Sequence, residues 1–124
     1  MARSEDREQM QLIKWTQQAD IRREFPQLKL LFHIANERHC SAQEGKRLKL
    51  MGVKSGVPDL FLPVPSGRYH GLFIELKAEN GKTSDNQLWW RTELNGQGYF
   101  SSVCYGWLQA SELIVSYLRG EYDV

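Results

Sequence analysis

A short strand that carries a carboxylate and a lysine constrains the fold of this chain more than any other segment. The apolar run at residues 71–74 leads directly into Glu75, Leu76 and Lys77. Because side chains alternate across a β-strand, Glu75 and Lys77 must share one face while Leu76 turns to the other. The sequence therefore predicts a strand over residues 71–77 with an apolar face and a charged face.

The preceding apolar run, residues 57–62, contains a second carboxylate, Asp59. Pro58 is acceptable near the start of a strand, where no ladder hydrogen bond is required of the proline nitrogen. The turn signal at residues 63–67 joins this run to residues 71–77, most simply as an antiparallel hairpin. Asp59 is therefore expected beside the strand that carries the other charges.

Asp59, Glu75 and Lys77 can then meet at one point. Carboxylate oxygens are hard ligands, and they suit Mg²⁺ or Mn²⁺ better than zinc. A lysine beside such an ion can hold an attacking water molecule or a phosphate oxygen. This combination of residues is typical of sites that hydrolyse phosphodiester bonds.

Composition sets the limits within which these motifs are interpreted. The chain has 124 residues and 41% hydrophobic content, which predicts a single domain over residues 1–124 with an ordinary core. Lys and Arg number 16 against 15 Asp and Glu, so DNA binding would require a local basic surface. The chain has two cysteines, Cys40 and Cys104, no apolar run of membrane-spanning length and no secretory signal, so a soluble, reducing, cytoplasmic setting is expected.

The remaining elements are predicted from local signals. A helix should run from Ser4 and end before Pro26, and residues 42–51 should form a short basic helix that ends at Gly52. Residues 28–34 are interpreted as a strand, although periodicity alone does not separate a short apolar run from a buried helix. Further along the chain, a capping box at residues 84–87 should open a helix ending at residues 95–96, followed by a strand at residues 98–104 and a closing helix over residues 108–118.

The order of these elements resembles the restriction-endonuclease-like fold of the PD-(D/E)XK nuclease superfamily, an α/β fold with a central mixed sheet flanked by helices. More narrowly, residues 52–60, residues 73–77 and the Ser84-Asp85-Asn86-Gln87 motif are similar to the stand-alone VRR-NUC domain of phages and bacteria. The likeness covers nearly the whole chain. In one departure, the basic triplet of that family survives here only as Val53-Lys54-Ser55.

The resemblance implies a set of metal ligands. Asp59 and Glu75 would bind Mg²⁺ or Mn²⁺, the backbone carbonyl of Leu76 would add a ligand, and Lys77 would orient or activate the water.

Two further site residues are implied with alternatives open. A glutamate of the first helix is expected at the metal, either Glu5 or Glu8, and Glu5 is preferred because it stands four residues before Gln9, as in related chains. Gln87 matches a glutamine that often lies beside the metal in the superfamily. It also has the position of a helix cap bonded to Ser84, and the two roles are compatible.

DNA contacts are expected from the basic patch formed by Lys46, Arg47, Lys49 and Lys54. Such a stretch is either a solvated helix face or a surface for phosphates, and lysine and arginine contacts to phosphate supply much of the affinity of DNA-binding proteins. Asn36 matches an asparagine common in related chains, so it either contacts substrate or satisfies turn backbone.

The resemblance implies a metal-dependent endonuclease of a bacterial or phage-infected cell. Stand-alone members are thought to resolve Holliday junctions, and a homodimer would offer two active sites related by the two-fold symmetry of a four-way junction. The alternatives are a nuclease acting on flaps, nicks or ordinary duplex, and a catalytically silent DNA-binding module on the same scaffold. Two intact, mutually repelling carboxylates argue against the silent module.

Overall fold

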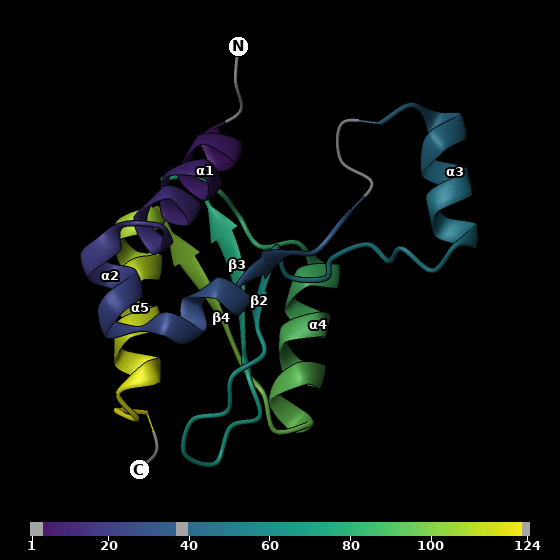
Figure 1. Cartoon of the computed structure of the whole chain (residues 1–124). Helices are drawn as coiled ribbons and strands as arrows, with labels where there is room; N and C mark the ends of the chain where they lie inside the picture. The colour runs from purple at the N-terminus through teal and green to yellow at the C-terminus, as the bar shows by residue number, and fades with distance from the viewer. Residues whose placement is uncertain (1–3, 37–39, 123–124) are drawn as a thin grey trace.

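The computed structural model describes residues 4–36 and 40–122, which form a mixed four-stranded sheet with helices on both faces (Figure 1). The strands are β1 (Phe32–His33), β2 (Leu60–Leu62), β3 (Leu72–Lys77) and β4 (Phe100–Tyr105); the helices are α1 (Ser4–Thr16), α2 (Ala19–Glu24), the 3₁₀ helix η1 (Pro26–Leu30), α3 (Ala42–Leu50), α4 (Asp85–Gly96) and α5 (Trp107–Leu118). Helices α1 and α5 pack on one face of the sheet, α4 packs on the other, and α3 lies apart. This arrangement confirms the predicted α/β class with a central mixed sheet.

The predicted single N-terminal helix is wrong, because the structure has two helices, α1 and α2, in its place. Gln18 has extended backbone angles, with φ −65° and ψ 140°, and it separates them. The Thr16 hydroxyl donates to the Ile13 carbonyl at 2.6 Å, and Arg22 Nε donates to the Thr16 carbonyl at 3.1 Å. These side-chain bonds satisfy backbone groups at the end of α1 and allow the chain to turn there.

The predicted strand over residues 28–34 is also mostly wrong. The 3₁₀ helix η1 occupies its first part, and only Phe32 and His33 pair with β2. Pro26 stands at the start of η1, where its fixed φ favours a helical turn and its missing N–H costs nothing. The turn directs Leu28, which is fully buried, into the core. Burial of Leu28 in the core therefore decides the local structure here, and the alternation of buried and exposed side chains that a strand would require is absent from η1.

The predicted hairpin is confirmed. Strands β2 and β3 are antiparallel, with Leu60 opposite Ile74 and Leu62 opposite Leu72. Strand β2 is shorter than the expected residues 57–62, because Pro58 and Asp59 come before its first ladder pair. Strand β4 then lies parallel to β3 on its other side, which confirms the strand predicted after α4.

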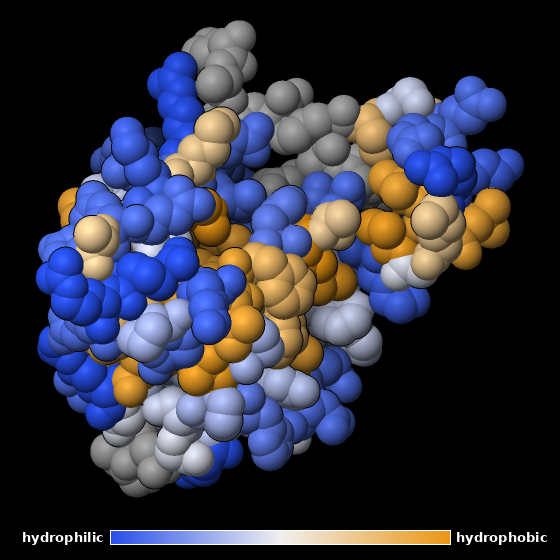
Figure 2. All heavy atoms as spheres, in the orientation of Figure 1, coloured by the Kyte–Doolittle hydropathy of each residue, from blue (hydrophilic) through white to orange (hydrophobic). Residues whose placement is uncertain are grey.

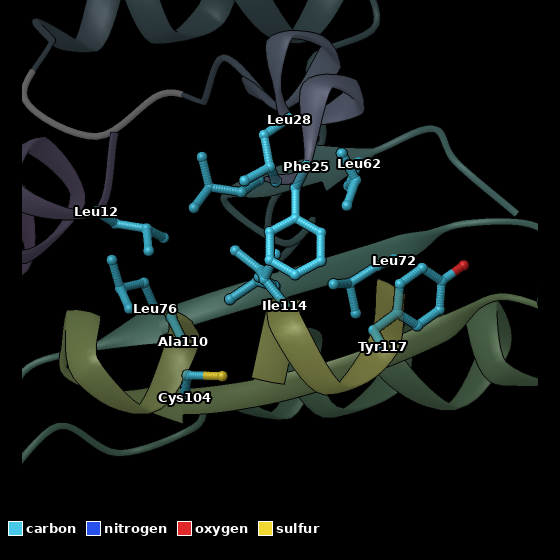
Figure 3. Packing of buried hydrophobic residues seen from close by; sticks show 12 residues of the cluster. Leu12, Phe25, Leu28, Leu62, Leu72, Leu76, Cys104, Ala110, Ile114 and Tyr117 are labelled. Atoms are coloured by element: carbon cyan, nitrogen blue, oxygen red, sulfur yellow. The ribbon is translucent and has the colours of Figure 1, made fainter. Parts of the chain in front are cut away.

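The core lies between the sheet and the layer formed by α1, α5 and η1 (Figure 3). Helix α5 contributes Ala110, Ile114 and Tyr117, whose spacing of four and three residues places them on one face. The Tyr117 hydroxyl, although buried, donates to the Val64 carbonyl at 2.7 Å. The buried hydrophobic residues are Leu12, Phe25, Leu28, Leu60, Leu62, Leu72, Ile74, Leu76, Cys104, Ala110, Ile114 and Tyr117.

Helix α3 confirms the predicted basic helix, and it stands away from the sheet (Figure 1). The Ser41 side chain accepts a hydrogen bond from the Glu44 N–H and caps its first turn, and Gly52 follows its end with φ 102°. Leu50 and Met51 are 83% and 68% exposed, and Figure 2 shows apolar side chains on this projecting part of the chain. The helix therefore presents both apolar and basic groups to solvent.

One edge of the sheet is strand β4, and two side-chain amides bond to its backbone. Asn95 of α4 accepts from the Ser101 N–H at 2.8 Å and donates to the Ser101 carbonyl at 3.4 Å. Gln109 of α5 accepts from the Tyr105 N–H at 2.7 Å. Backbone groups that face away from β3 are thus satisfied near both ends of the strand.

The described part of the chain contains no helix that is both long enough and apolar enough to cross a lipid bilayer. Neither Cys40 nor Cys104 forms a disulfide, and Cys104 is buried in the core.

We expect Cys104 to resist alkylation in the folded protein. Burial raises the pKa of its thiol to about 12, so at about pH 8 almost none of the reactive thiolate is present. Cys40 is half-buried. A thiol-reactive chromogenic reagent should therefore label one cysteine per folded chain and none in a Cys40→Ser variant until guanidinium is added. Rapid labelling of the folded variant would contradict the burial of Cys104.

Candidate active site

Asp59 lies immediately before β2 and is hydrogen-bonded to the last part of β3. Its Oδ2 atom accepts a hydrogen bond from the Leu76 N–H at 2.8 Å, and only 4% of the residue is exposed. The register that sets Leu60 opposite Ile74 places Asp59 opposite Glu75 when it is continued by one residue. Residues opposite each other in an antiparallel pair project to the same face. The hairpin therefore brings the two carboxylates to one side of the sheet.

Glu75 and Lys77 share this face, as the strand alternation predicts. Lys77 Nζ lies 3.7 Å from Glu75 Oε2, and both side chains are almost completely buried. The same Glu75 oxygen accepts a hydrogen bond from Gln87 Nε2 at 3.0 Å. An ammonium and an amide thus fix the orientation of one carboxylate.

Gln87 serves two roles at once. Its Oε1 atom accepts from the Ser84 N–H at 2.9 Å and its own N–H donates to Ser84 Oγ at 3.1 Å, which completes the predicted capping box of α4. Its Nε2 atom is left to donate to Glu75. The start of α4 and the position of a buried carboxylate therefore depend on the same side chain.

The donor set fits a hard divalent cation. Two carboxylates brought to one face repel each other, and burial removes the water that would screen them. Leu76 N–H and Lys77 offset part of this cost at Asp59 and Glu75. Carboxylate and carbonyl oxygens are the ligands that Mg²⁺ and Mn²⁺ prefer. Asp59, Glu75 and the carbonyl of Leu76 are the residues that would hold such an ion.

Glu8 is engaged at the start of α5. Its Oε1 atom accepts a hydrogen bond from the Trp107 N–H at 2.8 Å, across 99 residues of sequence. Gly106 precedes that helix and has no side chain with which to cap it, so the carboxylate of α1 supplies the cap.

Glu5 lies one turn before Glu8 on α1 and is half-buried. Within residues 4–36 and 40–122, no three His, Cys, Asp or Glu side chains form a group that could hold a metal ion. The structure therefore does not bring either glutamate together with Asp59 and Glu75, and the ligand role of Glu5 or Glu8 stays a prediction.

The predicted basic patch lies apart from the carboxylates of Asp59 and Glu75. Lys46, Arg47 and Lys49 lie on α3, which projects from the body of the chain. Lys54 is exposed on the return segment, residues 51–59, which leads from α3 back to the sheet (Figure 1). Arg47 Nε donates to Glu44 at 3.0 Å, and this hydrogen bond lowers the pKa of Glu44. The patch is an exposed surface that the structure does not bring together with Asp59 and Glu75.

Asn36 follows a residue that is hydrogen-bonded to the backbone of Asp59. The Ile34 N–H donates to the Asp59 carbonyl at 2.8 Å, and Asn36 follows two residues later, half-buried. Its role in substrate contact stays a prediction.

The return segment from α3 contains Gly56, a residue of the motif at residues 52–60 for which the sequence predicted no individual role. It has φ 90°, and a Cβ atom built on it would lie 2.6 Å from Asn86 Cβ and 2.7 Å from Asn86 C. The neighbouring Ser55 carbonyl accepts from Trp90 Nε1 at 3.1 Å. This contact with α4 fixes the chain three residues before Asp59. The glycine was the only signal of it in the sequence.

Comparison with known proteins adds to this geometry. The model of the VRR-NUC domain family matches residues 3–107. A solved structure described as a VRR_NUC domain protein is 28% identical, with a TM-score of 0.78, and the match covers 96% of this chain and 91% of the other. No curated protein matches the chain significantly.

We expect Gly56→Ala to destabilise the protein more than Gly52→Ala. Both glycines have positive φ, so each alanine should cost roughly 1–2 kcal/mol of backbone strain. Only Gly56 approaches another backbone, and that clash should add about 1–3 kcal/mol. Urea unfolding of the two variants measures the difference.

Gly52 is the matched control because its Cβ would meet no atom within 4 Å. Equal losses of unfolding free energy in the two variants would contradict the close packing of the return segment on α4.

Proposed function

The chain belongs to the VRR-NUC domain family, a nuclease-type domain, and on that premise we propose that it is a metal-dependent endodeoxyribonuclease. The observation that carries the proposal is the cluster at the hairpin. Asp59 and Glu75 are both 4% exposed, and Lys77 and Gln87 contact Glu75 directly. Charged groups are buried together at a cost that a purely structural hairpin has no need to bear.

The chemistry follows from the charge that phosphodiester hydrolysis develops. Attack of water places negative charge on the phosphoryl oxygens and on the leaving oxygen. Mg²⁺ or Mn²⁺, when bound by Asp59, Glu75 and the Leu76 carbonyl, would offset that charge. Lys77, whose ammonium is fixed by Glu75, would orient the attacking water. Gln87 acts as a positioning residue, because it holds the Glu75 carboxylate from the start of α4.

We propose DNA as the substrate and a branched duplex, the four-way junction, as its preferred form. Helix α3 supports this choice, since it extends Lys46, Arg47 and Lys49 away from the body into solvent. Lysine and arginine contacts to phosphates read the position of a backbone rather than its bases. A projecting basic helix is thus suited to recognition of branch shape.

A homodimer is proposed because each chain has a single cluster of Asp59, Glu75 and Lys77, which could cut only one DNA strand at a time. A dimer with two-fold symmetry presents two such clusters. Exposed apolar groups support self-association. Leu50 and Met51 on the α3 side and Leu88 and Trp89 on α4 are all solvent-exposed, Trp89 by 57%. Trp90, by contrast, is tied to Ser55 through its ring nitrogen.

We expect Asp59→Asn and Lys77→Ala each to reduce cleavage by at least about 100-fold, because one removes a metal ligand and the other removes the ammonium that aligns the water. Cleavage of labelled DNA in Mg²⁺ and in Mn²⁺ measures this loss, and EDTA should abolish wild-type activity.

Lys29→Ala is the matched control for the loss of one lysine, since Lys29 is exposed on η1. Unimpaired cleavage by both folded site variants would exclude the proposed site. A wild-type protein that binds DNA and leaves it uncut in Mn²⁺ would instead identify a silent binding module.

We expect cleavage of a four-way junction to exceed cleavage of flap, nicked and linear duplexes of the same sequence. The comparison should be made at equal enzyme concentration, with sedimentation measured in the same buffer to establish the dimer. Equal rates on all four DNAs would favour a general duplex nuclease, and a preference for the flap would favour a replication or repair nuclease.

A further inference from the structure

A cleft of about 640 Å³ lies between the second half of α4 and the first residues of β4. Its polar lining includes Arg68, Arg91, Asn95 and Ser102, with the rings of Tyr69 and Tyr99 beside them. None of Asp59, Glu75 and Lys77 lines it, so it is separate from the cluster described above.

The charge of this cleft has one sign. Two of its lining residues are arginines and none is a carboxylate, whereas the cleft beside Gly106 is lined by Glu8 and Glu79 and by no cation. Arg91 is half-buried, and no hydrogen bond or ion pair joins it to any of the residues that the structure describes. A guanidinium that is partly removed from water favours an anion with planar or tetrahedral oxygens as its partner.

The second arginine is held in a defined orientation. Arg68 Nη2 donates to Tyr69 Oη at 3.1 Å, and Arg68 Cζ lies 5.2 Å from the centroid of the Tyr69 ring. A guanidinium fixed by a neighbouring ring loses less freedom when it binds a ligand. The cleft therefore offers an ordered cation as well as an uncompensated one.

The position of Arg91 relates the cleft to the reaction centre. Gln87, Arg91 and Asn95 are spaced by four residues on α4, and residues at that spacing are neighbours on one strip of a helix. The first contacts Glu75 and the last bonds to Ser101 on β4, so both ends of the strip face the sheet. Arg91 lies between them, about 6 Å from Gln87 along the helix axis.

We infer that this cleft binds the phosphodiester backbone of the DNA strand that is cut, with Arg91 and Arg68 contacting phosphates on one side of the scissile bond. The inference rests on the proposed function in taking DNA as the substrate. It adds a second anchoring point, on the opposite half of α4 from the capping box.

The test is DNA binding by an Arg68→Ala/Arg91→Ala double variant, measured by fluorescence anisotropy in EDTA so that no strand is cut. Loss of two phosphate contacts should raise Kd at least about 10-fold and reduce the slope of log K against log salt by about two. An Arg91→Lys variant should bind DNA with an affinity between those of the wild type and the double variant. Lysine keeps the positive charge but lacks the fork of donors of arginine.

The matched control is Arg23→Ala/Lys29→Ala, which removes the same charge from exposed positions on α2 and η1. It should leave Kd within about twofold of the wild type. If the Arg68/Arg91 double variant behaves like this control, the inference is overturned while the proposed nuclease activity stands. If wild type binds and the double variant does not, yet no metal supports cleavage, the cleft is upheld and the proposed activity fails. Absence of any binding by wild type overturns both.

Discussion

The pairing of β2 with β3 is the constraint on which the rest of the molecule depends. With Leu60 opposite Ile74, the apolar side chains of both strands enter the core, and Asp59 and Glu75 project together on the other side. A slip of one residue would exchange the two faces of a strand, so it would bury charge in the core and remove leucine from it. The same register therefore determines the stability of the hydrophobic layer and the geometry of the candidate active site. The Asp59 hydrogen bond to the Leu76 N–H holds this register at the end of the ladder.

Helix α4 connects the two sites inferred along its length. At its start, Gln87 caps the helix and holds Glu75, so fraying of this turn would also release the carboxylate. One turn later, Arg91 lines the separate cleft, and Asn95, in the last turn of the helix, bonds to β4. A rigid helix transmits these positions more accurately than a loop would, because its rise per residue is fixed. The spacing between the candidate active site and the proposed anchoring cleft is thus a property of helical geometry.

Elements with strong local signals could be predicted from the sequence, and those decided by distant contacts could not. The capping box at Ser84 and the alternation around Glu75 depend on neighbours within a few residues, and both are present in the structure. The break between α1 and α2 instead depends on a bond from Arg22 to Thr16, and the turn of η1 depends on how Leu28 fits the core. The partner of Glu8 lies 99 residues away, so no local pattern could distinguish a cap of α5 from a metal ligand. Hydrophobic periodicity indicates which face of a helix or strand is buried, but it does not indicate which residues that face contacts.

The amides of Asn95 and Gln109 on β4 have a consequence for how copies of this chain can meet. An uncovered edge strand offers main-chain donors and acceptors to any extended segment, and this is the usual route to intermolecular sheets and fibrils. Here side chains of α4 and α5 occupy those groups near both ends of the strand. Substitutions at these two positions would therefore first lower the solubility of the protein at high concentration, even where Asp59, Glu75 and Lys77 are unchanged. Solubility thus depends on two amides that lie outside the cluster of Asp59, Glu75 and Lys77.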